Sequence, residues 1–158
     1  MCDFRIAEAE GYFDHACGAL QVNPDVARGK ADVVALPCPY GDEYYYAQET
    51  IDFVKYCRER DSCETFDLLS DDEIQVRSLH SFDLWLPVIY IAQNFLLPTV
   101  VGLVANYIYE RIKGHEQDRT KVEVSFLVEK EGESKLLSYS GDAEAFKEQF
   151  EKIDLNGL

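Results

Sequence analysis

The stretch LWLPVIYIAQNFLLPTVVGLVANYIY, from Leu84 to Tyr109, contains no charged residue. It decides the fold because a run of this length could form one membrane-spanning helix, which needs roughly 20 apolar residues, or the core of a globular domain. Two prolines, Pro87 and Pro98, divide the run, and Pro98 disfavours helix at the residue before it. The sequence therefore predicts a central buried helix over Leu84–Leu97 and a second helix from Pro98 to Lys113.

The second of these helices is predicted to be amphipathic. Its apolar residues recur at spacings of three and four and are Val100, Val101, Val104, Ile108 and Ile112. A polar strip that includes Asn106 and Glu110 falls on the opposite side, together with Tyr109, so one face should lie in a core and the other in water. A lipid-embedded helix would not keep such a strip without a partner. A single-span or membrane-docked protein that uses Leu84–Tyr109 is therefore the alternative, and self-association through this run is expected if it is not wholly buried.

The composition predicts one ordered domain. The chain has 158 residues, of which 47% are hydrophobic, and it carries a formal net charge of −15. The expected fold class is α+β: a helix-rich single layer of short, partly antiparallel strands packed against central apolar helices. Residues 1–158 form a single domain in this interpretation. A subdivision near residue 80 would separate an acidic α/β half, 1–80, from a helix–helix–hairpin–helix half, 81–158.

Periodicity and capping signals predict the remaining elements. Helices are expected over Phe4–Leu20 and from about Asp42 to Arg60, and a last helix should place Phe146, Phe150 and Ile153 on one face. Strands are expected at Asp32–Pro37, Thr65–Leu69, Lys121–Glu129 and Lys135–Tyr139. The sequence Ser70-Asp-Asp-Glu73 fits a capping box, which favours a short helix after it over a strand.

The strong negative charge limits the classes of partner. It repels phosphate backbones, which argues against nucleic acid, and it attracts basic proteins and speeds their encounter. Membrane docking is disfavoured because docking helices usually carry lysine and arginine. The five cysteines are odd in number and irregularly spaced, and the N-terminal residues do not resemble a signal peptide, so we expect reduced thiols in the cytoplasm.

A tyrosine-rich segment is the predicted partner surface. Its members are Tyr40, Asp42, Glu43, Tyr44, Tyr45 and Tyr46. Three consecutive tyrosines cannot all face a core from one helix, so at least one should be exposed. Tyrosine beside carboxylate suits arginine or lysine of a partner, because tyrosine is enriched among interface hot spots and its ring attracts cations.

Cysteine chemistry supplies the enzymatic alternative. Cys38 follows an expected buried strand and precedes an expected helix, and a helix N-terminus lowers a thiol pKa. A nucleophilic cysteine also needs a base, and none of the three histidines lies near Cys38 in the sequence. A zinc site at Cys57 and Cys63 is disfavoured, because more residues separate them than separate the paired ligands of usual zinc sites, and further ligands would be needed. We therefore expect no metal, no cofactor and no catalysis.

The second half of the chain resembles a known class of small proteins. The helix VGLVANYIYERIKG, Val101–Gly114, is followed by an expected hairpin and then by GDAEAFKEQFEKI, residues 141–153. This order is similar to that of small accessory domains of bacterial conflict systems, in defence or toxin immunity. The resemblance covers roughly residues 84–153 and implies a non-catalytic adaptor, accessory or immunity role in a bacterium, without assigning any functional residue.

Overall fold

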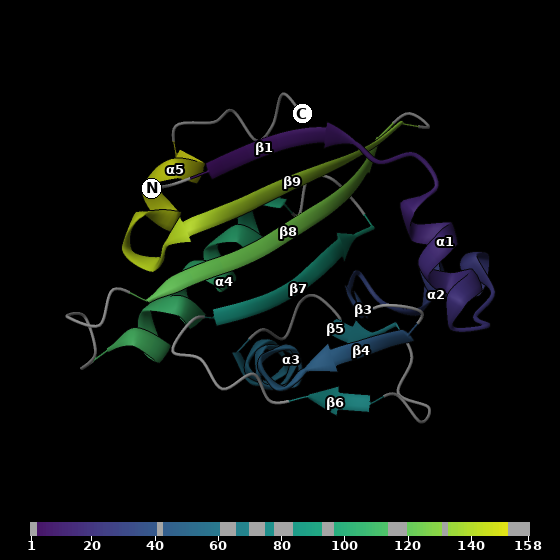
Figure 1. Ribbon diagram of the computed structural model, residues 1–158, viewed down its shortest axis with the longest axis horizontal. Coiled ribbons are helices and arrows are strands. Elements are labelled where there is room, and N and C mark those ends of the chain that lie inside the picture. Colours follow the sequence, from purple (N-terminus) through teal and green to yellow (C-terminus); the bar gives the residue numbers. More distant parts are fainter. Residues whose placement is uncertain are drawn as a thin grey trace.

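The fold is α+β, as predicted, and is built on one mixed sheet of six strands (Figure 1). The computed structural model describes residues 3–40, 43–60, 66–69, 75–77, 84–92, 97–113, 120–130 and 133–151. The six strands, in their order across the sheet, are β1 (Asp3–Glu8), β9 (Glu133–Asp142), β8 (Lys121–Lys130), β7 (Leu84–Ile91), β2 (Val33–Leu36) and β5 (Phe66–Leu68). Three of these strands come from residues 1–80 and three from 81–158, so the two halves share the sheet.

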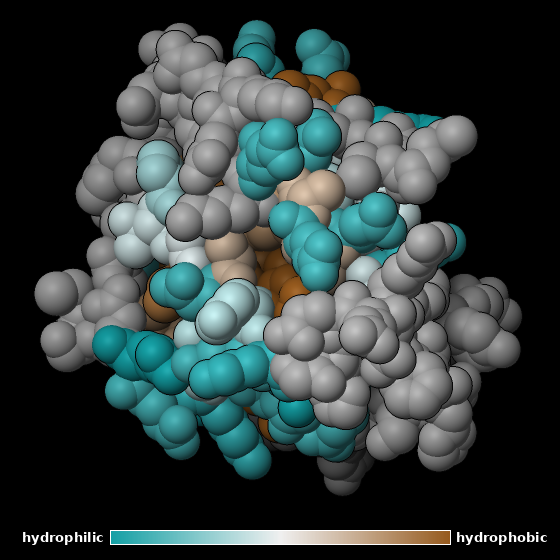
Figure 2. Space-filling model, turned by 90° about the vertical axis from the view of Figure 1, so that its left-hand side faces the viewer, coloured by the Kyte–Doolittle hydropathy of each residue, from teal (hydrophilic) through white to brown (hydrophobic). Residues whose placement is uncertain are grey.

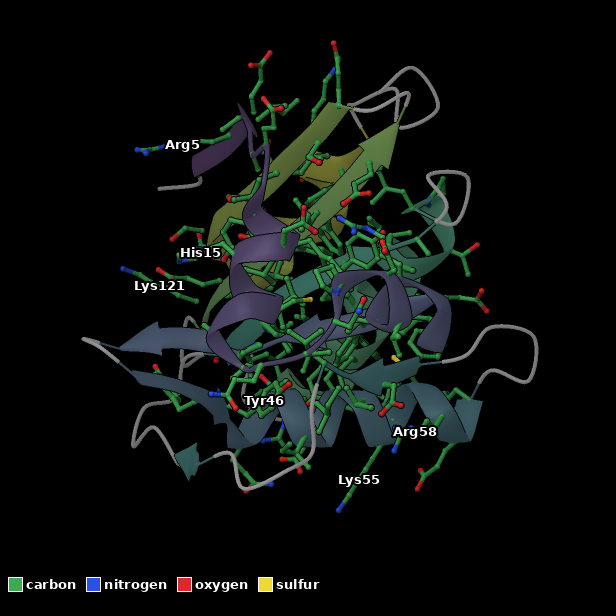
Figure 3. All side chains as sticks on the ribbon, turned by 90° about the vertical axis from the view of Figure 1, so that its right-hand side faces the viewer. Arg5, His15, Tyr46, Lys55, Arg58 and Lys121 are labelled. Atoms are coloured by element: carbon green, nitrogen blue, oxygen red, sulfur yellow. The ribbon has the colours of Figure 1, made fainter. Side chains whose placement is uncertain are left out.

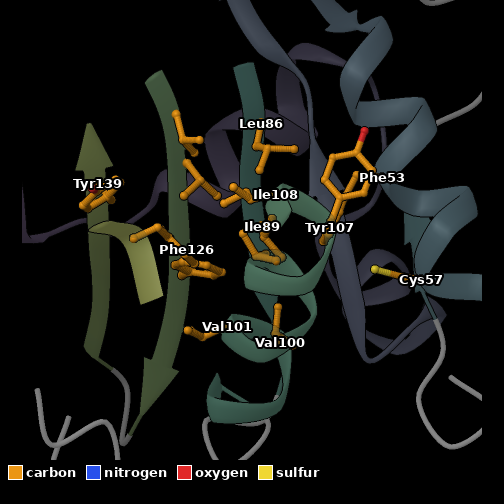
Figure 4. Close-up of a cluster of buried hydrophobic side chains, with 14 of the residues drawn as sticks. Phe53, Cys57, Leu86, Ile89, Val100, Val101, Tyr107, Ile108, Phe126 and Tyr139 are labelled. Carbon is orange, nitrogen blue, oxygen red and sulfur yellow. The ribbon is translucent and has the colours of Figure 1, made fainter. Parts of the chain in front are cut away.

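Helices pack on both faces of this sheet. One face carries α3 (Gln48–Arg60), α4 (Leu97–Ile112), the 3₁₀ turn η3 (Ala143–Ala145) and α5 (Phe146–Glu151); the other carries α1 (Tyr12–Ala19) and α2 (Pro24–Lys30). Figure 1 shows α4 behind the sheet and α1 and α2 at its right-hand end. The larger apolar cluster lies on the α4 side, where Ile89, Val100 and Phe126 are fully buried (Figure 4). The smaller one lies beneath α1 and α2.

The central helix predicted over Leu84–Leu97 is wrong, because residues 84–91 form strand β7. This strand lies between β2 and β8, and both of its faces contribute side chains to apolar clusters. The sequence of a central strand that is covered on both faces is a continuous apolar run. Periodicity alone does not distinguish such a run from the sequence of a buried helix. The β7–β8 register shifts between Trp85 and Val88, next to Pro87, whose missing N–H cannot join a regular ladder.

Two other predicted helices begin too early. The helix expected over Phe4–Leu20 is strand β1 followed by α1, and Gly11 separates them at a φ of 77°, a left-handed conformation that favours glycine. The helix expected from Asp42 is strand β4 (Glu43–Ala47) followed by α3. The consecutive tyrosines favour a strand, because aromatic residues pack well on a pleated surface.

Several predictions are confirmed. The amphipathic helix from Pro98 is α4, with Val100, Val104 and Ile108 on its buried face. The predicted strands at 32–37, 65–69, 121–129 and 135–139 correspond to β2, β5, β8 and β9, and the last two form an antiparallel hairpin. The final helix buries Phe146 and Phe150 as predicted, while Ile153 lies outside the described residues.

A small second sheet, in the order β3-β4-β6, accounts for part of the acidic first half. It joins β3 (Cys38–Tyr40) and β4 to β6 (Gln75–Arg77). The short helix expected after Ser70–Glu73 is therefore wrong where it would include residues 75–77, and the capping box itself lies outside the described residues. None of the helices in the described ranges combines the length and apolar character needed to cross a membrane. The charge-free run is divided between β7 and α4 and does not form one continuous helix.

The α1–α2 layer is held to the sheet by Arg28. Its guanidinium lies 2.9 Å from a carboxylate oxygen of Asp14 on α1 and 3.0 Å from one of Glu129 on β8. The same guanidinium lies 4.7 Å from the centre of the Phe13 ring, a cation–π geometry. One side chain thus joins both helices of this layer to the sheet beneath them.

The side chain of Asn23 caps the N-terminus of α2, and its contribution to stability can be tested. The Asn23 side chain accepts hydrogen bonds from the backbone N–H groups of Asp25, at 2.9 Å, and Val26, at 3.3 Å. We expect Asn23→Ala to lower the free energy of unfolding by about 1 kcal/mol, since it leaves N-terminal helix donors without that acceptor. Urea titration followed by circular dichroism measures the change. The control Asn23→Ser retains a side-chain acceptor, so an equal loss in both variants would contradict the capping role.

Candidate functional site

A hollow with an apolar floor opens between α4 and the segment that runs from η3 into α5. Figure 2 shows brown and tan side chains at the bottom of this hollow, with hydrophilic ones beside it. Its volume is about 400 Å³, within the range of roughly 300–1,000 Å³ that is usual for ligand pockets. We call it the α4–α5 pocket. Its described lining residues are Ala105, Asn106, Ile108, Tyr109, Ile112, Ala143, Glu144 and Phe146.

The floor of the α4–α5 pocket follows from helical spacing and side-chain size. Ile108 and Ile112 lie one turn apart on the same face of α4, and both are buried. Phe146 closes the opposite side and is also buried. Ala105 and Ala143 line the space between the two segments. Because each has only a methyl group, neither fills the gap that a larger side chain would occupy.

The wall formed by η3 and α5 is fixed by hydrogen bonds and ring contacts. The Tyr139 hydroxyl donates to the carbonyl oxygen of Asp142 at 2.7 Å, and the Ala143 N–H donates to the carbonyl of Thr120 at 2.9 Å. The Phe146 ring packs edge-on against Tyr139, with 5.3 Å between the ring centres. These contacts attach the wall to β8 and β9, so the pocket is supported by the sheet.

The rim of the pocket is polar and carries one large exposed aromatic side chain. Tyr109 is 63% exposed, and Asn106 and Glu144 are exposed beside it. Glu148 is exposed one turn further along α5. An apolar floor beside an exposed tyrosine and a carboxylate can bind an apolar group that carries a neighbouring cation or hydrogen-bond donor.

A second pocket, of about 350 Å³, lies on another side of α4, against α3. Its described lining is mostly charged and consists of Asp52, Lys55, Tyr56, Glu59, Tyr107, Glu110 and Arg111. Arg111 pairs with Glu49 through Nε at 3.0 Å and Nη2 at 3.2 Å, and Arg60 pairs with Glu110. The Tyr107 hydroxyl also donates to Glu49. These pairs join α3 to α4 directly.

The chemistry of this second pocket favours a structural role. Burial raises the pKa of Tyr107 well above its usual value of 10, and its hydrogen bond to Glu49 raises it further. Burial, followed by the nearby Glu110 carboxylate, likewise raises the pKa of Tyr56. A tyrosine that acts as a general base near neutral pH needs a lowered pKa, so neither hydroxyl is prepared for that task.

The tyrosine-rich surface predicted from the sequence is only partly described. Tyr45 and Tyr46 lie on β4, where Tyr45 is half-buried and Tyr46 is 2% exposed. Tyr46 therefore packs inside the fold and does not belong to an exposed surface. Asp42 lies outside the described residues, as do the side chains of Tyr40, Glu43 and Tyr44. Binding through these residues stays a prediction.

The cysteine positions differ from the sequence-based expectation in one respect. Cys38 begins strand β3 and pairs with Tyr45 of β4, and the next helix begins only at Gln48. The predicted position of Cys38 at a helix N-terminus is therefore wrong, and its side chain lies outside those described. Cys57 is fully buried on α3, as its apolar face predicted, and Cys63 lies outside the described residues. Within the described ranges, no group of three or more candidate ligands could hold a metal.

One feature of the sequence pointed to the α4–α5 pocket, but helical periodicity alone could not identify the pocket from it. Tyr109 falls on the polar side of the predicted helix, where a large aromatic residue is unusual. The other wall comes from Ala143–Phe146, which only the folded chain brings to α4. Comparison with protein-family models, with curated proteins and with solved structures found no match to the chain.

Proposed function

We propose that this chain is a non-catalytic, acidic interaction protein that binds a basic protein partner through the α4–α5 pocket. The observation that carries the proposal is an apolar pocket whose rim holds an exposed tyrosine, Tyr109, and a carboxylate, Glu144. Tyrosine is enriched among interface hot spots, and interface anchors are usually apolar or aromatic side chains seated in a pocket. The partner would insert one such side chain and place lysine or arginine near Glu144.

Charge supports a basic partner. The net charge of −15 speeds the approach of a positively charged protein and repels an acidic one. An adaptor, accessory or immunity role in a bacterial cytoplasm belongs to the same proposal and rests on the resemblance of residues 84–153. Self-association through the charge-free run would use exposed members that include Asn106 and Tyr109, and would compete with the partner for the same pocket.

The test is selection from a displayed library of random peptides on the purified protein. We expect the selected peptides to place an aromatic or large aliphatic residue next to lysine or arginine. Ala105→Phe, which fills the pocket, and Glu144→Lys, which reverses the rim charge, should each weaken their binding about tenfold or more, an energy of roughly 1.4 kcal/mol. Fluorescence anisotropy with labelled peptides measures the dissociation constants.

Glu123→Lys is the matched control, because Glu123 is an exposed carboxylate on β8 and does not line the pocket. It changes the net charge as much as Glu144→Lys does. Equal weakening by both substitutions would indicate non-specific charge attraction and contradict the pocket. Peptides that bind Ala105→Phe as well as they bind the unmodified protein would also overturn the proposal.

A further inference from the structure

Strand β1 lies at one edge of the main sheet. It is the first strand of the order β1-β9-β8-β7-β2-β5 and pairs with β9 along one side only. Within the described part of the chain, no strand pairs with its other side. Arg5, Ile6, Ala7 and Glu8 are all exposed, and Figure 3 shows Arg5 projecting outward from the strand. The outward-facing backbone groups of an edge strand can pair with another extended chain.

The register shows which backbone groups face outward. The Ala9 N–H donates to the carbonyl of Ser134 at 2.9 Å, and this pair continues the ladder in which Glu8 lies opposite Lys135. In an antiparallel ladder, every second residue directs both its N–H and its C=O toward the same neighbour. Ala9, Ala7 and Arg5 therefore face β9. The N–H and C=O groups of Ile6 and Glu8 face away from it.

The side chains at this edge suit a particular kind of strand. Ile6 is 47% exposed and therefore presents apolar surface beside the edge. Glu8 lies on the same face of the sheet two residues later, and the exposed carboxylates of Glu10 and Glu133 follow at that end. A second copy of the chain would itself carry a net charge of −15 and be repelled, whereas a basic strand would be attracted.

We infer that the outer edge of β1 binds an extended basic peptide segment by strand addition. In the antiparallel orientation, a basic residue lies opposite Glu8 and an apolar residue two positions later lies opposite Ile6, so the recognised pattern is basic–any–apolar. Backbone hydrogen bonds supply the attachment and the two side-chain contacts supply the preference. The inference rests on the proposed function in one respect, that the partner is basic, but it uses a different surface from the α4–α5 pocket.

The test uses the acetylated and amidated hexapeptide Thr-Lys-Thr-Ile-Thr-Thr as a probe. Two-dimensional NMR of the full-length protein should show the Ile6 and Glu8 amide signals shifting on addition of the peptide, with a dissociation constant in the range of roughly millimolar. N-methylation of the peptide isoleucine removes the N–H that would pair with Ile6 and should weaken binding about tenfold. N-methylation of the threonine before it removes an N–H that points away from β1 and should have little effect.

A protein variant provides an independent test of strand addition. Ile6→Pro removes an N–H that faces outward. The N–H groups that pair with β9 are retained, and an edge strand tolerates proline at such an outward-facing position. It should keep the melting temperature close to that of the unmodified protein and lose the peptide-induced shifts. Equal weakening by the two N-methylated peptides, or shifts that persist in Ile6→Pro, would overturn strand addition.

The remaining outcomes separate this inference from the proposed function. Self-association in analytical ultracentrifugation that Ile6→Pro abolishes would assign the edge to a second copy and contradict a peptide partner. Ala105→Phe should leave the hexapeptide bound, because it changes only the α4–α5 pocket. Failure of the library peptides with survival of the hexapeptide response would remove the pocket proposal alone, and the reverse result would remove strand addition alone.

Discussion

Replacing Phe126 with alanine is expected to lower the free energy of unfolding by about 3–5 kcal/mol, one of the largest effects of a single substitution in this chain. Phe126 lies near the middle of β8, is fully buried, and faces the cluster beneath α4 and α5. Its ring lies 5.5 Å from that of Phe150 and 6.5 Å from that of Phe146. Alanine would leave a cavity beside the rings of Phe146 and Phe150, which pack against each other and cannot fill it without a shift of α5.

The measurement is urea-induced unfolding followed by far-ultraviolet circular dichroism. Phe126→Leu is the matched control, because it keeps most of the apolar volume and should cost clearly less. Ser125→Ala tests the neighbouring position, where the hydroxyl lies 3.0 Å from that of Ser138, and should cost about 1 kcal/mol. A loss below about 1 kcal/mol for Phe126→Ala would contradict a closely packed cluster at this site.

The expected loss also bears on the candidate site. Phe146 lines the α4–α5 pocket and contacts the same aromatic cluster. If Phe126→Ala loosens α5, the pocket should lose peptide affinity even though Phe126 does not line it. A substitution such as Glu144→Lys should instead reduce affinity with little change in unfolding, since Glu144 is exposed. The two measurements together distinguish support of the pocket from direct contact with a partner.

The sequence predicted those elements whose burial pattern has a clear period. Helix α4 carries an apolar face and a polar face, and β8 alternates over most of its length, so both could be recognised from spacing. Strand β7 could not, because it is covered on both faces and has no polar side to reveal its period. Such a run forms a strand because it pairs with β2 and β8, and the sequence of the run itself does not contain these partners.

The sheet edge at β1 and the pocket were less accessible to sequence reasoning for the same physical reason. Strand β1 has the alternating sequence DFRIAE, but its position at the sheet edge depends on pairing with β9, more than 120 residues away by their register. The exposure of Tyr109 was predicted from the helix period, whereas the wall opposite it comes from the segment after β9. Tyr46 shows the reverse: its residue type suggested a surface, and the strand geometry of β4 buried it.

Tyr107→Phe is expected to change both the stability at neutral pH and the response to alkaline pH. The Tyr107 hydroxyl is buried and donates to the Glu49 carboxylate, which Arg111 also binds. Removing this donor should lower the free energy of unfolding by about 1.5–3 kcal/mol near pH 7, the value of a hydrogen bond to a charged group. Glu49 keeps its two contacts with Arg111, so the loss should stay within that range.

The alkaline response follows from the direction of the pKa shift. Burial, and then the hydrogen bond to Glu49, raise the pKa of Tyr107 in the folded state above the value near 10 of an unfolded chain. Below that value both states hold the proton and the stabilisation is complete. As the pH rises above it, the unfolded state releases a proton that the folded state retains, so stability falls by about 1.4 kcal/mol per pH unit for this group.

The difference between the unmodified protein and Tyr107→Phe isolates this contribution. Burial also raises the pKa values of Cys17, Tyr56 and Tyr90, so both proteins should lose stability in alkaline solution, but the variant should lose it less steeply above about pH 10. Urea unfolding at a series of pH values from 7 to about 11 measures the two slopes, and Tyr109→Phe on the same helix controls for loss of an exposed phenol. Parallel slopes would contradict a buried, proton-retaining Tyr107, because such a group requires the curves to converge as the pH rises.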